Sequence, residues 1–213
     1  MLAGDSLKTI VKTVPLLLLL VLLPGGCREQ SRRAGTPDTP RSTPPDIMID
    51  SALPTDTLLR RFQAALEEPA RLSPAASSRE ELTRRYLDAV ARSDTATLRE
   101  LHITRAEYAF LYFPESQMMR PPYELPPEVA WTLLSAESGK GISAILRRFS
   151  GKPLELRGVR CPGEPLREGT NIVWRDCVVR YQDERGAERE RPLFAAIIER
   201  AGEFKFFSYA TPL

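Results

Sequence analysis

The chain has 213 residues and a formal net charge of +2, because 30 lysines and arginines are set against 28 aspartates and glutamates. A nucleic-acid-binding face needs clustered basic residues, whereas arginine and glutamate are interleaved here, as in residues 185–191, so we expect a solvated surface and no nucleic-acid partner. The single histidine argues against most metal sites and leaves any nucleophilic scheme with one possible base, so we expect neither a metal nor a cofactor.

The first 27 residues follow the layout of a secretory signal peptide. Lys8 and Lys12 make the start positive, residues 14–23 are nearly all apolar, and small residues precede Cys27. These correspond to the n-region, the apolar h-region of roughly 7–15 residues and the cleavage site of an exported protein. A helix that spans a membrane needs about 20 apolar residues, so a permanent transmembrane segment is the weaker interpretation.

The end of this stretch resembles a bacterial lipoprotein signal, in which the cysteine becomes the lipidated first residue of the mature protein. Gly25-Gly26-Cys27 matches the small-small-Cys end of that motif, and Pro24 departs from it, because leucine usually stands three residues before the cysteine. The resemblance implies a signal peptide over residues 1–26, lipidation of Cys27, and attachment to the cell membrane or the outer membrane, facing the periplasm. An ordinary cleaved signal and an uncleaved anchor are the alternatives.

A linker and a short helix come next. Residues 27–54 are rich in Pro, Ser, Thr and Arg and bury too little apolar surface to fold, so we expect a disordered, extended tether. Residues 55–76 are expected to hold a connector and an amphipathic helix that stops before Pro69, with an apolar face of Leu58, Leu59, Phe62 and Leu66. A helix of this length is marginal alone in water, so it must dock, either on its own globular domain or on a partner protein.

Residues 77–213 are expected to form one α+β domain that begins with helices. Two helices are expected to start at capping boxes, formed by Ser78 with Glu81 and by Thr104 with Glu107. Ser93-Asp94 is expected to divide the first run into two helices, with Asp94 as the cap of the second. A dense aromatic cluster over residues 108–113 is cut off by Pro114. A helix over residues 128–138 is expected to be interrupted at residues 139–141, Gly-Lys-Gly, and to turn inward the side chains of Val129, Leu133 and Leu134.

Strand-like runs follow over residues 154–161, 171–181, 192–200 and 204–210, and their short loops favour an antiparallel meander. In the second run apolar residues stand at both odd and even positions, so they would point to both faces of a strand. This predicts either a bulge near Arg175-Asp176 or a strand covered on both faces. Along the last run Phe204 and Phe206 are expected to point one way, and Phe207 and Tyr209 the other. One face of the sheet then needs a helix layer, and the other is available to a second subunit, which predicts a homodimer through the sheet.

Cys161 and Cys177 are the pair that remains once Cys27 is assigned to the signal. In an oxidising compartment such a pair favours a structural disulfide, and a hairpin folded about Gly169 would bring the two cysteines face to face. Closing a loop of about 16 residues contributes ~3 kcal/mol on the chain-entropy estimate. Two buried free thiols are the alternative.

The order of helices, aromatic loop and closing strands resembles the NTF2-like (SnoaL-like) superfamily. The likeness covers about residues 77–213, and its most recognisable parts are the opening helix ELTRRYLDAVARSDTATLREL and the terminal strands LFAAIIERAGEFKFFSYA. It implies a cone in which N-terminal helices pack on a curved, four-stranded antiparallel sheet around a pocket.

Enzymes of this superfamily place an Asp or His base, with a Tyr or Asp acid, deep in the cone. The resemblance therefore makes His102, Asp88 and Tyr108 the catalytic candidates, and it makes pocket candidates of Tyr86, Tyr112, Trp131 and Trp174. Each also has a structural explanation, because a histidine at a helix end often bonds a carbonyl and aromatic residues more often fill a core.

These observations leave three hypotheses of function. The leading one is a membrane-anchored envelope lipoprotein whose domain binds a small apolar ligand or a protein partner without catalysis. The second is a small isomerase, cyclase or hydrolase-like enzyme that uses His102 or Asp88. The third is a structural or assembly protein of the envelope that recruits a partner through the helix over residues 56–68. An apolar pocket favours the first, a convergent Asp-His-Tyr set the second, and an undocked helix face the third.

Overall fold

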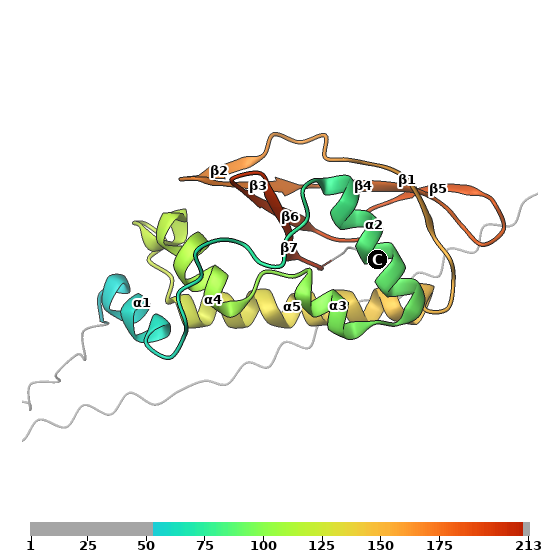
Figure 1. Ribbon diagram of the computed structural model, residues 1–213. Coiled ribbons are helices and arrows are strands. Elements are labelled where there is room, and N and C mark those ends of the chain that lie inside the picture. Colours follow the sequence, from blue (N-terminus) through green and yellow to red (C-terminus); the bar gives the residue numbers. More distant parts are fainter. Residues whose placement is uncertain (1–52, 211–213) are drawn as a thin grey trace, which may run out of the picture. The chain divides into compact units, whose positions relative to one another are not determined.

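The computed structural model describes residues 53–210, which form helices packed against antiparallel strands (Figure 1). The predictions for the signal peptide, for Cys27 and for the linker up to residue 52 lie outside these residues. The helices are α1 (Thr55–Gln63), α2 (Arg79–Arg92), α3 (Thr95–Glu100), α4 (Arg105–Glu107), the π-helix η1 (Tyr108–Tyr112), the 3₁₀ turns η2 (Phe113–Glu115) and η3 (Gln117–Met119), and α5 (Pro127–Phe149). The strands are β1 (Glu155–Arg160), β2 (Leu166–Glu168), β3 (Asn171–Arg175), β4 (Val178–Gln182), β5 (Glu188–Arg191), β6 (Ala196–Arg200) and β7 (Glu203–Ser208). The predicted α+β class is therefore confirmed.

The first helix docks on its own domain. α1 ends at Gln63, earlier than predicted, and its side chains Leu59 and Phe62 are only 7% and 4% exposed. The Gln63 side-chain amide donates a 2.9 Å hydrogen bond to the carbonyl oxygen of Ala109 in η1. Burial of this apolar face explains how so short a helix is held.

The predicted starts of α3 and α4 are confirmed. The Asp94 carboxylate accepts a hydrogen bond from the N–H of Thr97 at 3.0 Å, and Ser93 ends α2 in the left-handed region, with φ of 57°. Thr104 and Glu107 form a reciprocal capping box, which fixes the chain as it enters α4.

The capping box predicted at α2 is only half formed. Ser78 accepts the N–H of Glu81 at 3.1 Å, as predicted. The Glu81 carboxylate, however, accepts both the N–H and the hydroxyl of Ser77 instead of the N–H of Ser78. Those hydrogen bonds lower the pKa of Glu81.

α5 is one continuous helix of 23 residues through the glycines that were predicted to interrupt it. Gly141 is buried because the backbone of Tyr209 lies directly against it, and a Cβ there would overlap the Tyr209 carbonyl oxygen. The predicted inward face was wrong for Val129 and Leu133, which are 45% and 58% exposed, whereas Leu134 is half-buried and packs against a hydrophobic core. The buried face is instead formed by Ala130, Ser138, Gly141, Ile145 and Phe149.

The strands divide between two antiparallel sheets, with the orders β1-β4-β5 and β2-β3-β6-β7. β3 pairs with β2 and β6, whereas β4 pairs with β1 and β5. The prediction of four strands in one sheet was wrong, because β2 and β5 lie outside the predicted runs and the strands divide between two sheets. The predicted run over residues 171–181 is thus two strands, and Asp176, with φ of 55°, stands between them. This break, rather than a bulge within one strand, explains the predicted change of phase at that place.

A disulfide joins Cys161 and Cys177 between the two sheets. Arg160 in β1 pairs with Val178 in β4, and the next position beyond that pair holds Cys161 on one side and Cys177 on the other. Their Cα atoms lie 4.0 Å apart, inside the limit of about 7 Å for such a bond. The intervening hairpin is β2–β3, which turns at Gly169 in the left-handed region. The predicted disulfide is confirmed.

Both faces of the four-stranded sheet are covered by helices of the same chain. Neighbouring positions along β7 belong to different hydrophobic cores, since Phe206 packs with α2 and the second half of α5, whereas Phe207 packs with α1, η1 and the first half of α5. Tyr209 lies in the same core as Phe206, with ring centroids 4.9 Å apart, so the prediction that it points with Phe207 was wrong, because β7 ends at Ser208. The predicted homodimer stays a prediction.

A buried ion pair ties β7 to the helices. Lys205 Nζ lies 2.9 Å from Glu107 Oε2, and the two side chains are 0% and 2% exposed. Glu107 also accepts the N–H groups of Ser73 at 2.6 Å and Thr104 at 2.7 Å. Burial lowers the pKa of Lys205, and the Glu107 carboxylate opposes that shift. The pair therefore stands in a hydrogen-bonded network rather than alone.

The outer edge of β7 is covered by two short segments, and one of them carries the histidine. Ala76 exchanges two backbone hydrogen bonds with Phe204, at 3.0 and 2.9 Å. Phe206 donates to the Leu101 carbonyl and accepts from the N–H of Ile103, both at 2.8 Å. His102 is thereby fixed beside β7, between α3 and α4.

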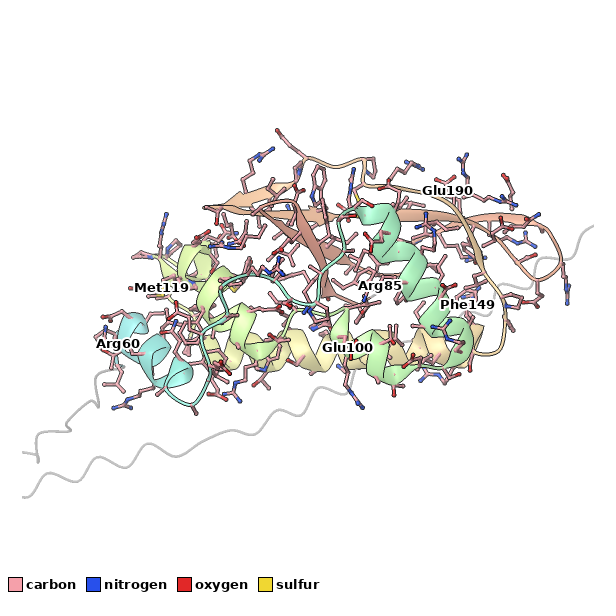
Figure 2. All side chains as sticks on the ribbon, in the orientation of Figure 1. Arg60, Arg85, Glu100, Met119, Phe149 and Glu190 are labelled. Atoms are coloured by element: carbon pink, nitrogen blue, oxygen red, sulfur yellow. A yellow bond between two sulfur atoms is a disulfide. The ribbon has the colours of Figure 1, made fainter. Side chains whose placement is uncertain are left out.

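Several surface charges are paired with a neighbour of opposite sign. All four residues of β5 are exposed and charged, and Glu190 accepts a 2.9 Å hydrogen bond from Arg160 of β1. On α1, Arg60 pairs with Asp56 at 2.9 Å. Figure 2 shows Arg60 and Glu190 at the outside of the molecule, as the interleaved charges predicted.

Candidate functional site

Two of the candidate residues, His102 and Trp131, meet in a groove between α5 and the connection from α3 to α4. The groove encloses about 300 Å³, at the lower end of the size of small-molecule sites. Ile103, Trp131 and Ile142 supply its apolar walls, and His102 and Ser138 supply polar atoms. A site of this size and lining fits a small, largely apolar molecule.

The hydrogen bonds of His102 define its tautomer. Nδ1 lies 2.7 Å from the carbonyl oxygen of Ile103, so Nδ1 carries the hydrogen and donates it. Nε2 then accepts the hydroxyl hydrogen of Ser138, whose Oγ lies 3.0 Å away. Burial lowers the pKa of His102 to about 4, so the ring is neutral at physiological pH.

The contact between Ser138 and His102 has the geometry of a nucleophile and its base, but its surroundings argue for a structural role. Ser138 is 4% exposed, and its Oγ also accepts the backbone N–H of Tyr209 at 3.3 Å. A base with a pKa near 4 is far from the value near the operating pH that favours proton abstraction. The pair links α5 to the end of β7 and to the α3–α4 connection.

The other catalytic candidates do not line this groove. Tyr108 is 1% exposed within a hydrophobic core, and its hydroxyl has no hydrogen-bond partner among residues 53–210. Burial, together with the charge of Glu168, raises the pKa of Tyr108. Asp88 is exposed on α2, beside a separate surface hollow that includes Leu154. The structure therefore brings together no Asp-His-Tyr set from these three residues.

Of the four pocket candidates, only Trp131 reaches the groove. Tyr86 is core, since its hydroxyl donates to the Leu193 carbonyl at 2.8 Å and its ring stacks on that of Tyr209. Tyr112 is also buried, and burial raises its pKa. Trp174 is half-buried on β3, where its Nε1–H donates to the Glu199 carboxylate at 2.8 Å.

Sequence reasoning missed Ser138, Ile142 and the rim residue Arg99. Trp131, Ser138 and Ile142 are separated by seven and four residues, which places them on one face of a continuous helix. This spacing is present in the sequence. A helix break was predicted at residues 139–141, however, so Ile142 was not assigned to the same helix as Trp131 and Ser138. Arg99 carried no signal, because its place at the groove depends on tertiary structure that brings α3 and α5 to the same site.

Neither a metal centre nor a membrane-crossing helix is found in the described part of the chain. Over residues 53–210, no group of three or more His, Cys, Asp or Glu side chains is placed to hold a metal ion. In the same range, every helix is too short or too polar to cross a membrane.

Comparison with known proteins finds no protein-family model, curated protein or solved structure that matches this chain. The chemistry of the groove is accordingly the basis for assigning a function.

Proposed function

We propose that this protein is a lipid-anchored component of the cell envelope whose folded domain binds a small apolar ligand in the groove between α5 and the α3–α4 connection, without catalysis. The observation that carries the proposal is the groove itself, where the half-buried side chains of Trp131 and Ile142 present apolar surface to an open site. Concave, mostly apolar sites with a few polar groups are the usual form of small-molecule sites.

The anchoring half of the proposal rests on the leader. Its positive start, apolar run and Gly25-Gly26-Cys27 end support export and lipid attachment at Cys27. The Pro-rich residues 28–46 support a tether that holds the domain away from the membrane surface. The disulfide between Cys161 and Cys177 agrees with an oxidising compartment.

An NTF2-like cone with a curved sheet is the fold we propose for this domain. The order of helices before strands supports it, as does the antiparallel pairing of strands that follow one another in the chain, β2 with β3, β4 with β5 and β6 with β7. The space on the α2 side of the strands is filled by packed rings, with Tyr86 lying 5.9 Å from Phe194 and 5.1 Å from Phe206. A ligand therefore has its site in the lateral groove rather than among these rings.

The two alternative functions have less support. An enzyme of the superfamily type needs an Asp or Tyr side chain free to act with His102, and Asp88 and Tyr108 do not line the groove. The ring of Tyr209 lies 5.3 Å from that of His102, but Tyr209 is fully buried and its hydroxyl donates to the Leu98 carbonyl. An assembly role through α1 needs its apolar face free, whereas Leu59 and Phe62 are buried.

Equilibrium binding of decanamide, a neutral molecule with an apolar chain, tests the proposal. The parent for all arms is the full chain carrying Cys27→Ser, so that no attached acyl chain competes for the groove. Ile142→Glu places a carboxylate on the apolar wall and should weaken binding at least about tenfold.

Leu133→Glu is the matched control, because nine residues of an α-helix are two and a half turns and place Leu133 on the opposite, exposed side of α5. It should leave the affinity unchanged. No binding by the parent chain, or an equal loss in both variants, overturns the proposed function.

A further inference from the structure

The charge at the rim of the groove is unbalanced. Arg99, exposed on α3, lines the groove and has neither an ion pair nor a side-chain hydrogen bond within residues 53–210. Arg105, which also lines it, is already engaged, since it pairs with Glu128 at 2.8 Å and lies over the ring of Phe62. No Asp or Glu of the described segment lines the groove, so Arg99 is a cation beside apolar walls without a counterion there.

The other polar groups of the groove are already occupied. Ser135 donates its hydroxyl to the Trp131 carbonyl at 2.7 Å, and Ser138 is bonded to His102. The hydroxyl oxygen of Thr104 accepts the N–H of Glu107. Among the described residues that line the groove, Arg99 is therefore the charged hydrogen-bond donor left for the polar head of a ligand, and the body of the ligand contacts apolar side chains.

We propose that the ligand of this groove is an amphiphilic carboxylate, whose head group pairs with Arg99 and whose alkyl or aromatic body lies against Trp131 and Ile142. The inference rests on the proposed function and names the class of ligand for the same site. A guanidinium presents a planar fork of N–H donors that matches the two oxygens of a carboxylate. Neighbouring apolar side chains reduce the water around such a pair and so strengthen it.

Two probes of the same length separate the charge from the apolar body. Decanoate and decanamide share one chain and differ in the charge of the head group. The Cys27→Ser chain should bind decanoate about fivefold more tightly than decanamide at low ionic strength, and the preference should shrink as salt is added. Arg99→Gln should abolish the preference and leave decanamide affinity unchanged.

Arg92→Gln is the matched control, because Arg92 is an exposed arginine on α2 that does not line this groove. It should keep the preference for decanoate. Equal affinity of the parent chain for both probes overturns the carboxylate inference and leaves the proposed function standing. A decanoate preference that survives Arg99→Gln also overturns the inference, and a parent chain that binds neither probe overturns both proposals.

Discussion

Gly141 in the middle of α5 and Tyr209 just after β7 touch through their backbones, with no room for a side chain between them. One turn earlier on the same helix, Ser138 accepts the N–H of Tyr209 at 3.3 Å. The segment after β7 is thereby held against α5. Ser138 also donates a hydrogen bond to His102, so the same residue of α5 forms part of the polar lining of the groove.

The neighbouring glycines of α5 should respond in opposite directions to the same substitution. Gly141→Ala forces the Cβ into the Tyr209 carbonyl and should lower the free energy of unfolding by about 1–3 kcal/mol, as overpacking does. Gly139→Ala meets nothing within 4 Å and should raise it by about 0.5–1 kcal/mol, because alanine loses less backbone entropy in a helix. Denaturant unfolding measures both. Two changes of the same sign would contradict the close approach of α5 and Tyr209.

The buried ion pair should show strong coupling. Lys205→Met or Glu107→Gln alone leaves a buried group without its partner, so each should lower the free energy of unfolding by about 3–5 kcal/mol. The double variant should lose clearly less than the sum, because no unpaired charge remains. Additive losses would show that the two groups do not interact.

Arg71 and Glu203 provide a control for that cycle. This ion pair also ties β7 to another part of the chain, the connection between α1 and α2, but it lies at the surface, with the two groups 3.0 Å apart and the Arg71 side chain 73% exposed. Arg71→Gln should change the free energy of unfolding by less than about 1 kcal/mol.

Much of the helix and strand order follows from local sequence signals, because caps and turns act over a few residues. Asp94 and Thr104 cap as predicted, and Cys161 and Cys177 pair as predicted. The continuity of α5 was not predictable, because glycine normally costs a helix about 1 kcal/mol and the contact with Tyr209 that requires Gly141 is formed by a segment nearly 70 residues away.

The candidate site was predictable only in part, for a related reason. His102 and Trp131 stood out as residue types, but whether they meet depends on how the α3–α4 connection lies against α5. Tyr86 and Tyr108 stood out equally and lie in the cores, since an aromatic residue gives the same signal in a core as in a pocket.

His102 should make stability fall as the pH is lowered. Its native pKa is about 4, below the ordinary value of ~6.5. Between pH ~6.5 and about 4 the histidine is therefore protonated in the unfolded chain but not in the folded chain. The free energy of unfolding should therefore be largest above pH ~6.5 and decline by up to about 3 kcal/mol as the pH approaches 4.

Because the chain has one histidine, its ring signals in a proton NMR titration are unambiguous and should report this pKa directly. His102→Asn should flatten the decline between pH 6.5 and 4.5, since the depressed pKa values of Glu115 and Asp183 act only at lower pH. A midpoint near 6.5 would show that the imidazole is exposed to water.

Lipid attachment at Cys27 is tested by Cys27→Ser in the native host. The exchange removes the sulfur that would carry the lipid, so the chain should lose acylation and move from the membrane to the soluble envelope fraction. Fractionation with mass spectrometry of the N-terminal peptide measures this, with Cys161→Ser as a control that keeps Cys27. Unchanged membrane association of the Cys27→Ser chain would contradict the anchor.

The groove as a ligand site is tested most directly by the two tryptophan indole signals in an NMR titration of the Cys27→Ser chain with decanoate. The chain has two tryptophans, of which Trp131 lines the groove and Trp174 is bonded to Glu199 away from it. Trp131→Phe assigns the two signals. The groove predicts that the Trp131 indole signal shifts progressively to saturation while that of Trp174 stays in place; movement of Trp174 alone, or of neither signal, would contradict it.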